Sequence, residues 1–152
     1  MSGFVYNVLL FLHIASAITA VGSNATYGWW FVRARTEPAQ LGFVLKTVKF
    51  IDDRIANPAY GVLLITGLVM TFMSWRITDL WIIAALVLFA AIAVLGIAFF
   101  SPLLKRQIAL ADAGQTASPE FEGLMERSRR FGPALGLAVL IILVLMVFKP
   151  AL

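Results

Sequence analysis

The chain has 152 residues, of which 61% are hydrophobic and 13% are charged, and it contains no cysteine. A soluble domain of this size would expose too much apolar surface at that composition. The lack of thiols also excludes disulfides, iron–sulfur clusters and thiolate metal sites.

Four apolar runs account for most of the chain, and each is long enough to cross a bilayer as a helix. They are Phe4–Gly22, Pro58–Trp75, Leu80–Phe100 and Phe131–Phe148. Including their flanks, we predict spans at about 4–32, 58–76, 80–104 and 131–148. The predicted fold class is an all-α integral membrane protein, a four-helix transmembrane bundle forming a single domain over residues 1–152.

The first predicted helix has two different sides. At about 100° per residue, one stripe carries Tyr6, His13, Ala17, Ala20, Asn24 and Tyr27, and the other side carries Phe11, Ile14, Ile18, Val21, Ala25 and Trp29. In a membrane the small and polar stripe is expected to face protein and the bulky side to face lipid. His13 should therefore point into the bundle, about 14 Å along the helix from Phe4 and close to the midplane.

The segment before the second span predicts a short amphipathic helix on the inner membrane surface. Its apolar face carries Leu41, Val44, Val48, Ile51 and Ile55. Asp52, Asp53 and Arg54 are expected to form a solvated face with local ion pairs, with a substrate or headgroup site as the alternative. Asn57 and Pro58 resemble an N-cap and first helical residue. The second span carries a small and polar stripe of Tyr60, Gly67, Thr71 and Ser74.

Three features mark the second half of the chain. Pro102 predicts a kink or break near the inner end of the third span. Residues 109–116 are expected to form a loop, after which Ser118 caps a short cytoplasmic helix running toward Arg130. Gly132 and Gly136 are expected to mediate close packing within the bundle, with dimerisation as the alternative.

The basic residues predict the orientation of the bundle. Ten of the twelve Lys and Arg lie in the first and third connections, between spans one and two and between spans three and four. The positive-inside rule places these connections in the cytoplasm and both termini outside, as expected for a bacterial inner-membrane protein. The net charge of +4 is thus explained by topology and anionic lipid, and nucleic acid is not an expected partner.

His13 is the one side chain within the apolar runs that titrates near neutral pH. Three interpretations are open: an axial haem ligand, a proton or quinone site, and a structural histidine bonded to another helix. For haem, His13 is the candidate axial ligand, and Ala17, Ala20, Asn24 and Gly67 are candidate pocket-lining residues. With one histidine, the second axial position of the iron would be empty, filled by another residue type, or filled by His13 of a second copy. Beyond such a haem iron no metal site is expected, because no second imidazole exists.

Three segments carry a family resemblance: "LHIASAITAVGS", "NPAYGVLLITGLVM" and "LMVFKP". Together they resemble the four-helix membrane family catalogued as domain of unknown function 2269, over nearly the whole chain. The "LH" and "TG" pairs are also similar to the copper-resistance protein D family and to the HemJ-type protoporphyrinogen oxidases. In the latter a histidine of the N-terminal helix is implicated in haem binding, and His13 occupies the similar position. That family also relies on a lysine within its helices, and the copper family on further histidines, all of which this chain lacks.

We therefore expect an inner-membrane protein that binds haem b through His13. The first alternative is a membrane oxidoreductase acting on porphyrin or quinone, and the second is an accessory subunit of a larger membrane complex. The sequence leaves open whether the protein is an enzyme. The expected partners are the lipid bilayer and either a second copy or a larger complex.

Overall fold

The computed structural model describes residues 3–150, apart from the side chain of Arg35. All regular elements in this range are helical. They are α1 (Gly3–Thr36), η1 (Pro38–Gln40), α2 (Leu41–Ile51), η2 (Asp52–Ala56), α3 (Asn57–Ser74), α4 (Leu80–Leu95), η3 (Gly96–Phe100), α5 (Ser101–Asp112) and α6 (Pro119–Phe148). Four continuous helical segments are long and apolar enough to cross a membrane, which confirms the predicted four-helix membrane bundle.

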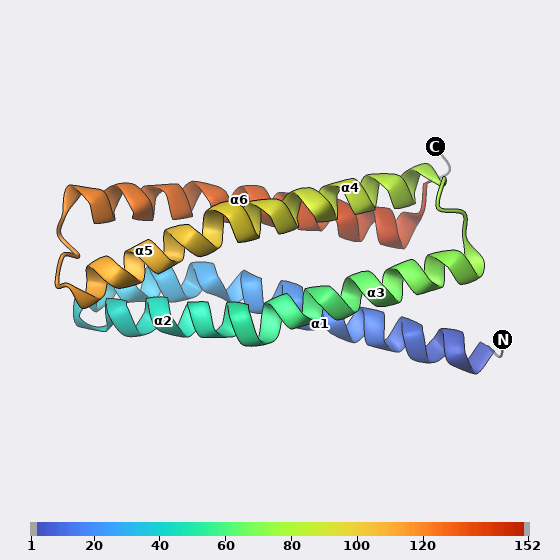
Figure 1. The fold of residues 1–152 in the computed structure, drawn as a ribbon, viewed down its shortest axis with the longest axis horizontal. Helices are drawn as coiled ribbons and strands as arrows, with labels where there is room; N and C mark the ends of the chain where they lie inside the picture. The colour runs from blue at the N-terminus through green and yellow to red at the C-terminus, as the bar shows by residue number, and fades with distance from the viewer. Residues whose placement is uncertain (1–2, 151–152) are drawn as a thin grey trace.

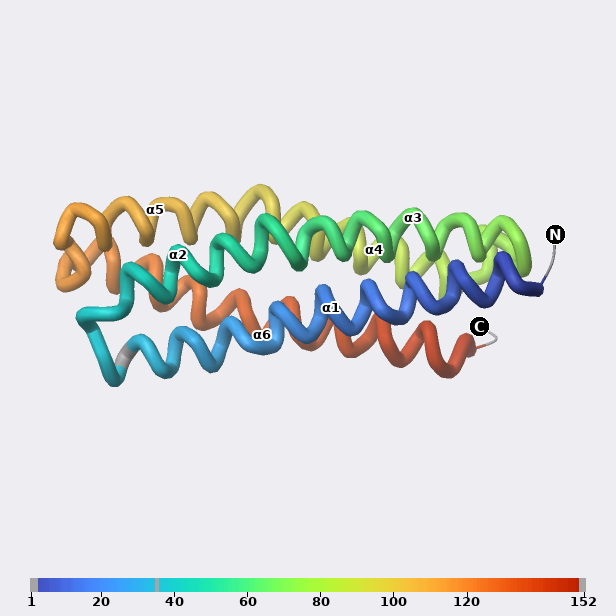
Figure 2. The backbone as a smooth tube through the Cα atoms, turned by 90° about the horizontal axis from the view of Figure 1, so that it is seen from below, coloured from blue at the N-terminus to red at the C-terminus, as the bar shows by residue number. Residues whose placement is uncertain are grey.

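The helices lie side by side in one elongated bundle (Figure 1). α1 packs along α3, α4 packs along α6, and α2 packs against α1 and α5. The start of α1, the turn between α3 and α4 and the end of α6 lie together at what we call the terminal end (Figure 1). The opposite end, which holds the α1–α2 turn and the α5–α6 loop, is here called the basic end (Figures 1 and 2).

The bundle is longer than a bilayer core is thick. The helical segment from Leu80 to Asp112 has 33 residues, which corresponds to about 50 Å at 1.5 Å per residue. The hydrocarbon core of a membrane is about 30 Å thick. About 20 Å of the bundle must therefore extend beyond that core, and the positions of the charged residues put this extension at the basic end.

The two ends of the bundle are packed differently. The main cluster of buried apolar residues lies at the basic end and consists of Tyr27, Ala34, Val44, Leu45, Val48, Leu104, Leu110 and Phe121. Charged pairs such as Lys46–Asp112 and Arg106–Glu120 lie outside it. This is the apolar-inside, polar-outside arrangement of a water-soluble helix bundle. Toward the terminal end, large apolar side chains such as Phe11, Ile18 and Val87 point outward, as expected for contact with lipid.

The predicted amphipathic helix is confirmed as α2, but its position differs from the prediction. α2 does not lie flat beside the bundle; it continues in line with α3, through η2 (Figure 1). Its buried face packs on α1 and α5. Asn57 is correspondingly not an N-cap but the first residue of α3 within an uninterrupted helical segment.

A π-helical turn precedes a proline in two segments. In η2 the Asn57 N–H donates to the Asp52 carbonyl oxygen, and in η3 the Ser101 N–H donates to the Gly96 carbonyl oxygen. Pro58 and Pro102 follow these turns directly. A proline ring clashes with the carbonyl group four residues earlier, and the wider π turn relieves that crowding. The irregularity predicted near Pro102 is therefore present, as a π turn without a break.

α6 joins two predicted elements into one helix. The helix capped by Ser118, whose Oγ accepts from the Phe121 N–H at 3.2 Å, continues through Pro133 to Phe148. The predicted packing role of Gly132 and Gly136 is wrong. Both glycines are exposed, and a Cβ atom added to either would meet no atom within 4 Å. They face away from the other helices, so they provide no close contact within the chain.

Candidate functional site

The two-sided pattern of α1 is confirmed and places His13 at the interface with α3. Ala20 and Tyr27 on the predicted inner stripe are buried, whereas Phe11 and Ile18 on the other side are each 69% exposed. His13 itself is half-buried. The imidazole therefore leaves α1 on the side that meets α3, as the sequence predicted.

The Nδ1 atom of His13 has two partners on α3. It lies 3.0 Å from the carbonyl oxygen of Leu63 and 3.1 Å from Oγ1 of Thr66. The Thr66 hydroxyl donates its own hydrogen to backbone carbonyl oxygens of α3, at 2.7 Å for Val62. A carbonyl oxygen can only accept, so Nδ1 carries the proton of the neutral ring. The lone pair of the imidazole is then on Nε2, which has no hydrogen bond to any described residue.

Gly67 makes room for the imidazole. A Cβ atom at this position would lie 2.9 Å from Cε1 and 3.4 Å from Nδ1 of His13. Real Cβ contacts are almost never that short, so the ring occupies the space that any larger side chain would need. The structure thus brings His13 and Gly67 into direct contact.

The other predicted lining residues lie along the same stripe of α1. Ala17 is half-buried and Ala20 has no exposed surface. Asn24 lies eleven residues beyond His13, about 16 Å along the helix, where its Nδ2 donates to the Tyr60 hydroxyl at 2.7 Å. Asn24 therefore belongs to a second polar cluster and not to the immediate surroundings of His13.

Leu63 and Thr66, the α3 contacts of His13, were not predicted from the sequence. The predicted stripe of α3 contains Gly67 but not Thr66, which points about 100° away around the helix axis. The signal that could have identified it is the hydroxyl next to the one glycine of the stripe. Gly67 is small enough to make room for the imidazole, and the neighbouring Thr66 hydroxyl lies within hydrogen-bond distance of Nδ1.

The second polar cluster lies toward the basic end, where α1, η2 and α3 meet. It contains Asn24, Tyr27, Asp52, Asn57 and Tyr60. Asp52 is buried, at 9% exposure, and burial raises the pKa of its carboxyl group above the ordinary value. Of the predicted solvated face, Asp53 is exposed and paired with Lys49 as expected, whereas Asp52 points inward.

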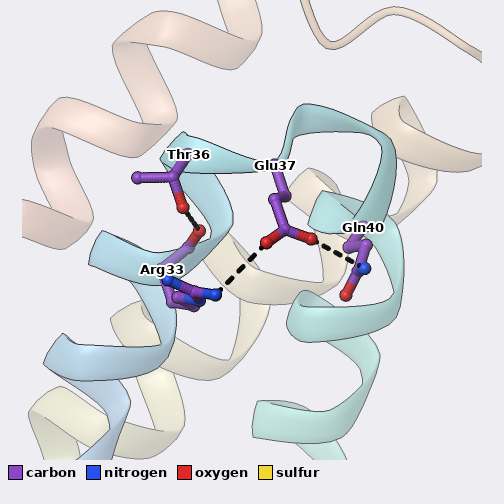
Figure 3. Close-up of polar contacts among 4 residues, drawn as sticks. All are labelled: Arg33, Thr36, Glu37 and Gln40. Carbon is purple, nitrogen blue, oxygen red and sulfur yellow. Dashed lines mark hydrogen bonds and ion pairs between the residues drawn. The ribbon is translucent and has the colours of Figure 1, made fainter.

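Polar contacts at the basic end fix the turns between the helices. Glu37 accepts from Arg33 at 3.3 Å and from Gln40 at 2.9 Å, and so ties the end of α1 to the start of α2 (Figure 3). Arg129 and Arg130 both pair with Glu126. Within residues 3–150, no group of three His, Asp or Glu side chains is placed to hold a metal ion.

Comparison with known families agrees with this architecture. The family model described as "Predicted integral membrane protein (DUF2269)" matches residues 7–150, which include His13 and all four membrane helices apart from the first residues of α1. The chain belongs to the DUF2269 family. No curated protein and no solved structure matches it. The DUF2269 assignment thus establishes an integral membrane protein and leaves its activity to be inferred from the site.

Proposed function

We propose that this protein is a bacterial inner-membrane protein that binds haem through Nε2 of His13. The observation that supports the proposal is the hydrogen bond from Nδ1 to the Leu63 carbonyl oxygen. A histidine that ligates a metal almost always donates its other ring N–H to a carbonyl oxygen, a carboxylate or water. That bond fixes the tautomer and the ring orientation, and it leaves the Nε2 lone pair available for iron.

The residues around His13 are suited to different parts of this role. Gly67 admits the imidazole to the interface, so we propose that it positions the ligand. Ala17, one turn along α1, is small enough to leave space beside the ring, and Ala20 and Asn24 continue that stripe. When bound, haem would supply a one-electron redox centre at this position.

The absorption spectrum of the detergent-purified protein tests the haem proposal. We expect a Soret band that is lost in His13→Ala while the circular dichroism of a folded helical bundle remains. Thr66→Val is the matched control, because it removes one contact of Nδ1 but keeps the bond to the Leu63 carbonyl oxygen. It should keep the Soret band. A coloured His13→Ala variant with an unchanged spectrum would remove His13 from the ligand list.

A colourless wild-type protein would support a structural role for His13 instead. In that case His13→Ala should mainly lower stability, by about 0.6 kcal/mol, the average for a hydrogen bond between membrane helices. Redox turnover of a porphyrin or quinone by the coloured protein would extend the proposal to an oxidoreductase. Colour without turnover would limit it to haem binding.

An accessory role in a larger membrane complex is favoured by a separate observation. The most apolar 18-residue window of α6 has no buried residue within the chain, and Gly132 and Gly136 lie on its surface. Exposed small residues allow another helix to approach closely in a membrane. Purification in a mild detergent distinguishes the two roles, because an accessory subunit should be colourless and elute together with larger partners.

We further propose that both termini lie outside the cytoplasm. This rests on the excess of Lys and Arg at the basic end and on the position of the start of α1 and the end of α6 at the terminal end (Figure 1). Leu152 lies outside the described residues. A reporter protein fused after it should be active if it is of a kind that works in the periplasm, and inactive if it works only in the cytoplasm. Alkaline phosphatase should therefore be active there and green fluorescent protein dark. The same reporters placed after Gly114, in the α5–α6 loop, should give the reverse result.

A further inference from the structure

The polar cluster between α1, η2 and α3 contains buried oxygen atoms without partners. Asn24 donates through Nδ2 to the Tyr60 hydroxyl, but its Oδ1 atom is buried and accepts no hydrogen bond from a described residue. The Tyr27 hydroxyl is buried too, on a side chain that is only 7% exposed, and it has no described partner. Buried polar atoms are nearly always satisfied, so two such atoms one turn apart on α1 indicate that an occupant belongs here.

The cluster also contains a buried carboxylate without a cation of its own. Asp52 is 9% exposed, and the hydrogen bond that its carboxylate accepts from a described residue is a long one, 3.4 Å, from Nδ2 of Asn57. The ammonium group of Lys49, which acts on the Asp52 carboxylate, is paired with Asp53. Two carboxylates therefore share one positive charge. Arg54, also on η2, is exposed and forms no ion pair with a described residue. A buried charge must be paired or neutralised, so the cluster lacks one positive charge.

Regular helical spacing in α2 directs Asp52 into this cluster, because Asp52 lies four residues after the buried Val48 and its N–H bonds to the Val48 carbonyl oxygen. The π turn of η2 begins at Asp52 and adds one residue, so the inward face shifts only after it. After this shift Ala56 is buried, while Ile55, which a regular helix would turn inward, is 42% exposed. Both tyrosine hydroxyls of the cluster, of Tyr27 and Tyr60, lie within electrostatic reach of the Asp52 carboxylate. Oxygen atoms from α1, η2 and α3 thus lie in one region of the bundle, where these three elements contact each other.

We propose that this cluster binds a monovalent alkali cation, held by the carboxylate of Asp52 together with Oδ1 of Asn24 and the hydroxyl of Tyr27. The potential ligands are all oxygen atoms, which hard cations prefer. One positive charge balances the cluster, whereas a divalent ion would leave an excess. Two hollows at the basic end are lined by other residues and are separate from this cluster. The site is independent of His13.

The thermal stability of the detergent-purified protein tests this proposal. Unfolding is followed by tryptophan fluorescence in sodium, potassium or choline chloride at equal ionic strength. Above the titration range of Asp52, sodium or potassium should raise Tm saturably, and choline should not, because a ligand that binds the folded state stabilises it by mass action. The preferred ion is the one with the lower half-saturating concentration.

The pH dependence follows from competition with a proton. The pKa of Asp52 is raised in the folded protein. In choline this carboxyl group therefore contributes fully to stability at pH values below the ordinary carboxyl range, and that contribution to stability is lost as pH rises through the raised pKa. Sodium or potassium should offset that loss, so the difference in Tm between the salts should grow with pH.

Two variants and one control assign the effect to the cluster. Asp52→Asn should abolish the dependence on the cation. Tyr27→Phe keeps the ring and the fold but removes one ligand, and should weaken the apparent affinity by about tenfold. Asp112→Asn is the control, because Asp112 is an exposed carboxylate paired with Lys46, and it should respond like the wild type. Equal Tm in the three salts at every pH would overturn the proposal. A rise in Tm with sodium or potassium that persists in Asp52→Asn would also overturn the proposal. The same holds if the pH dependence of Tm is the same in choline as in sodium and potassium.

Discussion

Gly67→Ala should destabilise the protein by about 1–3 kcal/mol, the range for forcing an extra methyl group into a packed interface. The added Cβ would lie 2.9 Å from Cε1 of His13, so the ring or the α3 backbone must move. Movement of the ring would also lengthen the bond from Nδ1 to the Leu63 carbonyl oxygen. Gly67→Leu should cost more, because the longer side chain has no space between α1 and α3. Thermal unfolding in detergent measures both variants.

A double-mutant cycle shows whether His13 is the cause. If the clash with the imidazole produces the loss, Gly67→Ala should be close to neutral in a His13→Ala background, and the two changes should be strongly non-additive. Gly61→Ala is the matched control on the same helix, because a Cβ there meets nothing within 4 Å. Val87→Phe, at a position that is 61% exposed, should also be tolerated. Full additivity of Gly67→Ala and His13→Ala would contradict the packing of the ring against this glycine.

The membrane fold was predictable because its signals are strong and repeated. Four long apolar runs with charged residues between them leave few other architectures. The stripe of α1 was predictable for a similar reason. Small and polar residues recur at helical spacing from Tyr6 to Tyr27, and bulky residues occupy the other side. Because lipid does not favour helix association through apolar burial, the small and polar side is the one that packs.

The details that the sequence did not reveal depend on helix register and on contacts between distant segments. A π turn adds one residue, and nothing in the local composition of η2 distinguishes it from a regular turn. The shift exposes Ile55 and buries Ala56, whereas Asp52 was assigned to a solvated face although it lies four residues after the buried Val48 on the inward side. The partner of His13 is a backbone carbonyl group, which every residue possesses, so no residue type marks it. Gly132 and Gly136 have the spacing of a helix-packing motif, but no other described helix of this chain approaches them.

The buried apolar core should stabilise the basic end against unfolding. Leu45→Ala should therefore cause the other large loss of stability. Leu45 has no exposed surface and lies within the apolar cluster formed by α1, α2, α5 and α6. Removing a fully buried leucine side chain costs about 2–5 kcal/mol, from lost transfer free energy and the cavity that remains. A loss of this size arises where a side chain is transferred out of water. In the lipid-facing part of the bundle the alternative environment is equally apolar, so truncation there should cost much less.

Phe43→Ala provides the matched control on α2. Phe43 is two residues from Leu45 but is 65% exposed, so its truncation leaves no cavity and should change stability by no more than about 0.5 kcal/mol. Denaturant titration of both variants in the same detergent compares them directly. Equal losses would mean that α2 is not packed into a core, and that it instead lies with its apolar face on the membrane surface. A large loss for Leu45→Ala alone would support a bundle whose basic end folds like a soluble protein and rigidly connects the membrane helices.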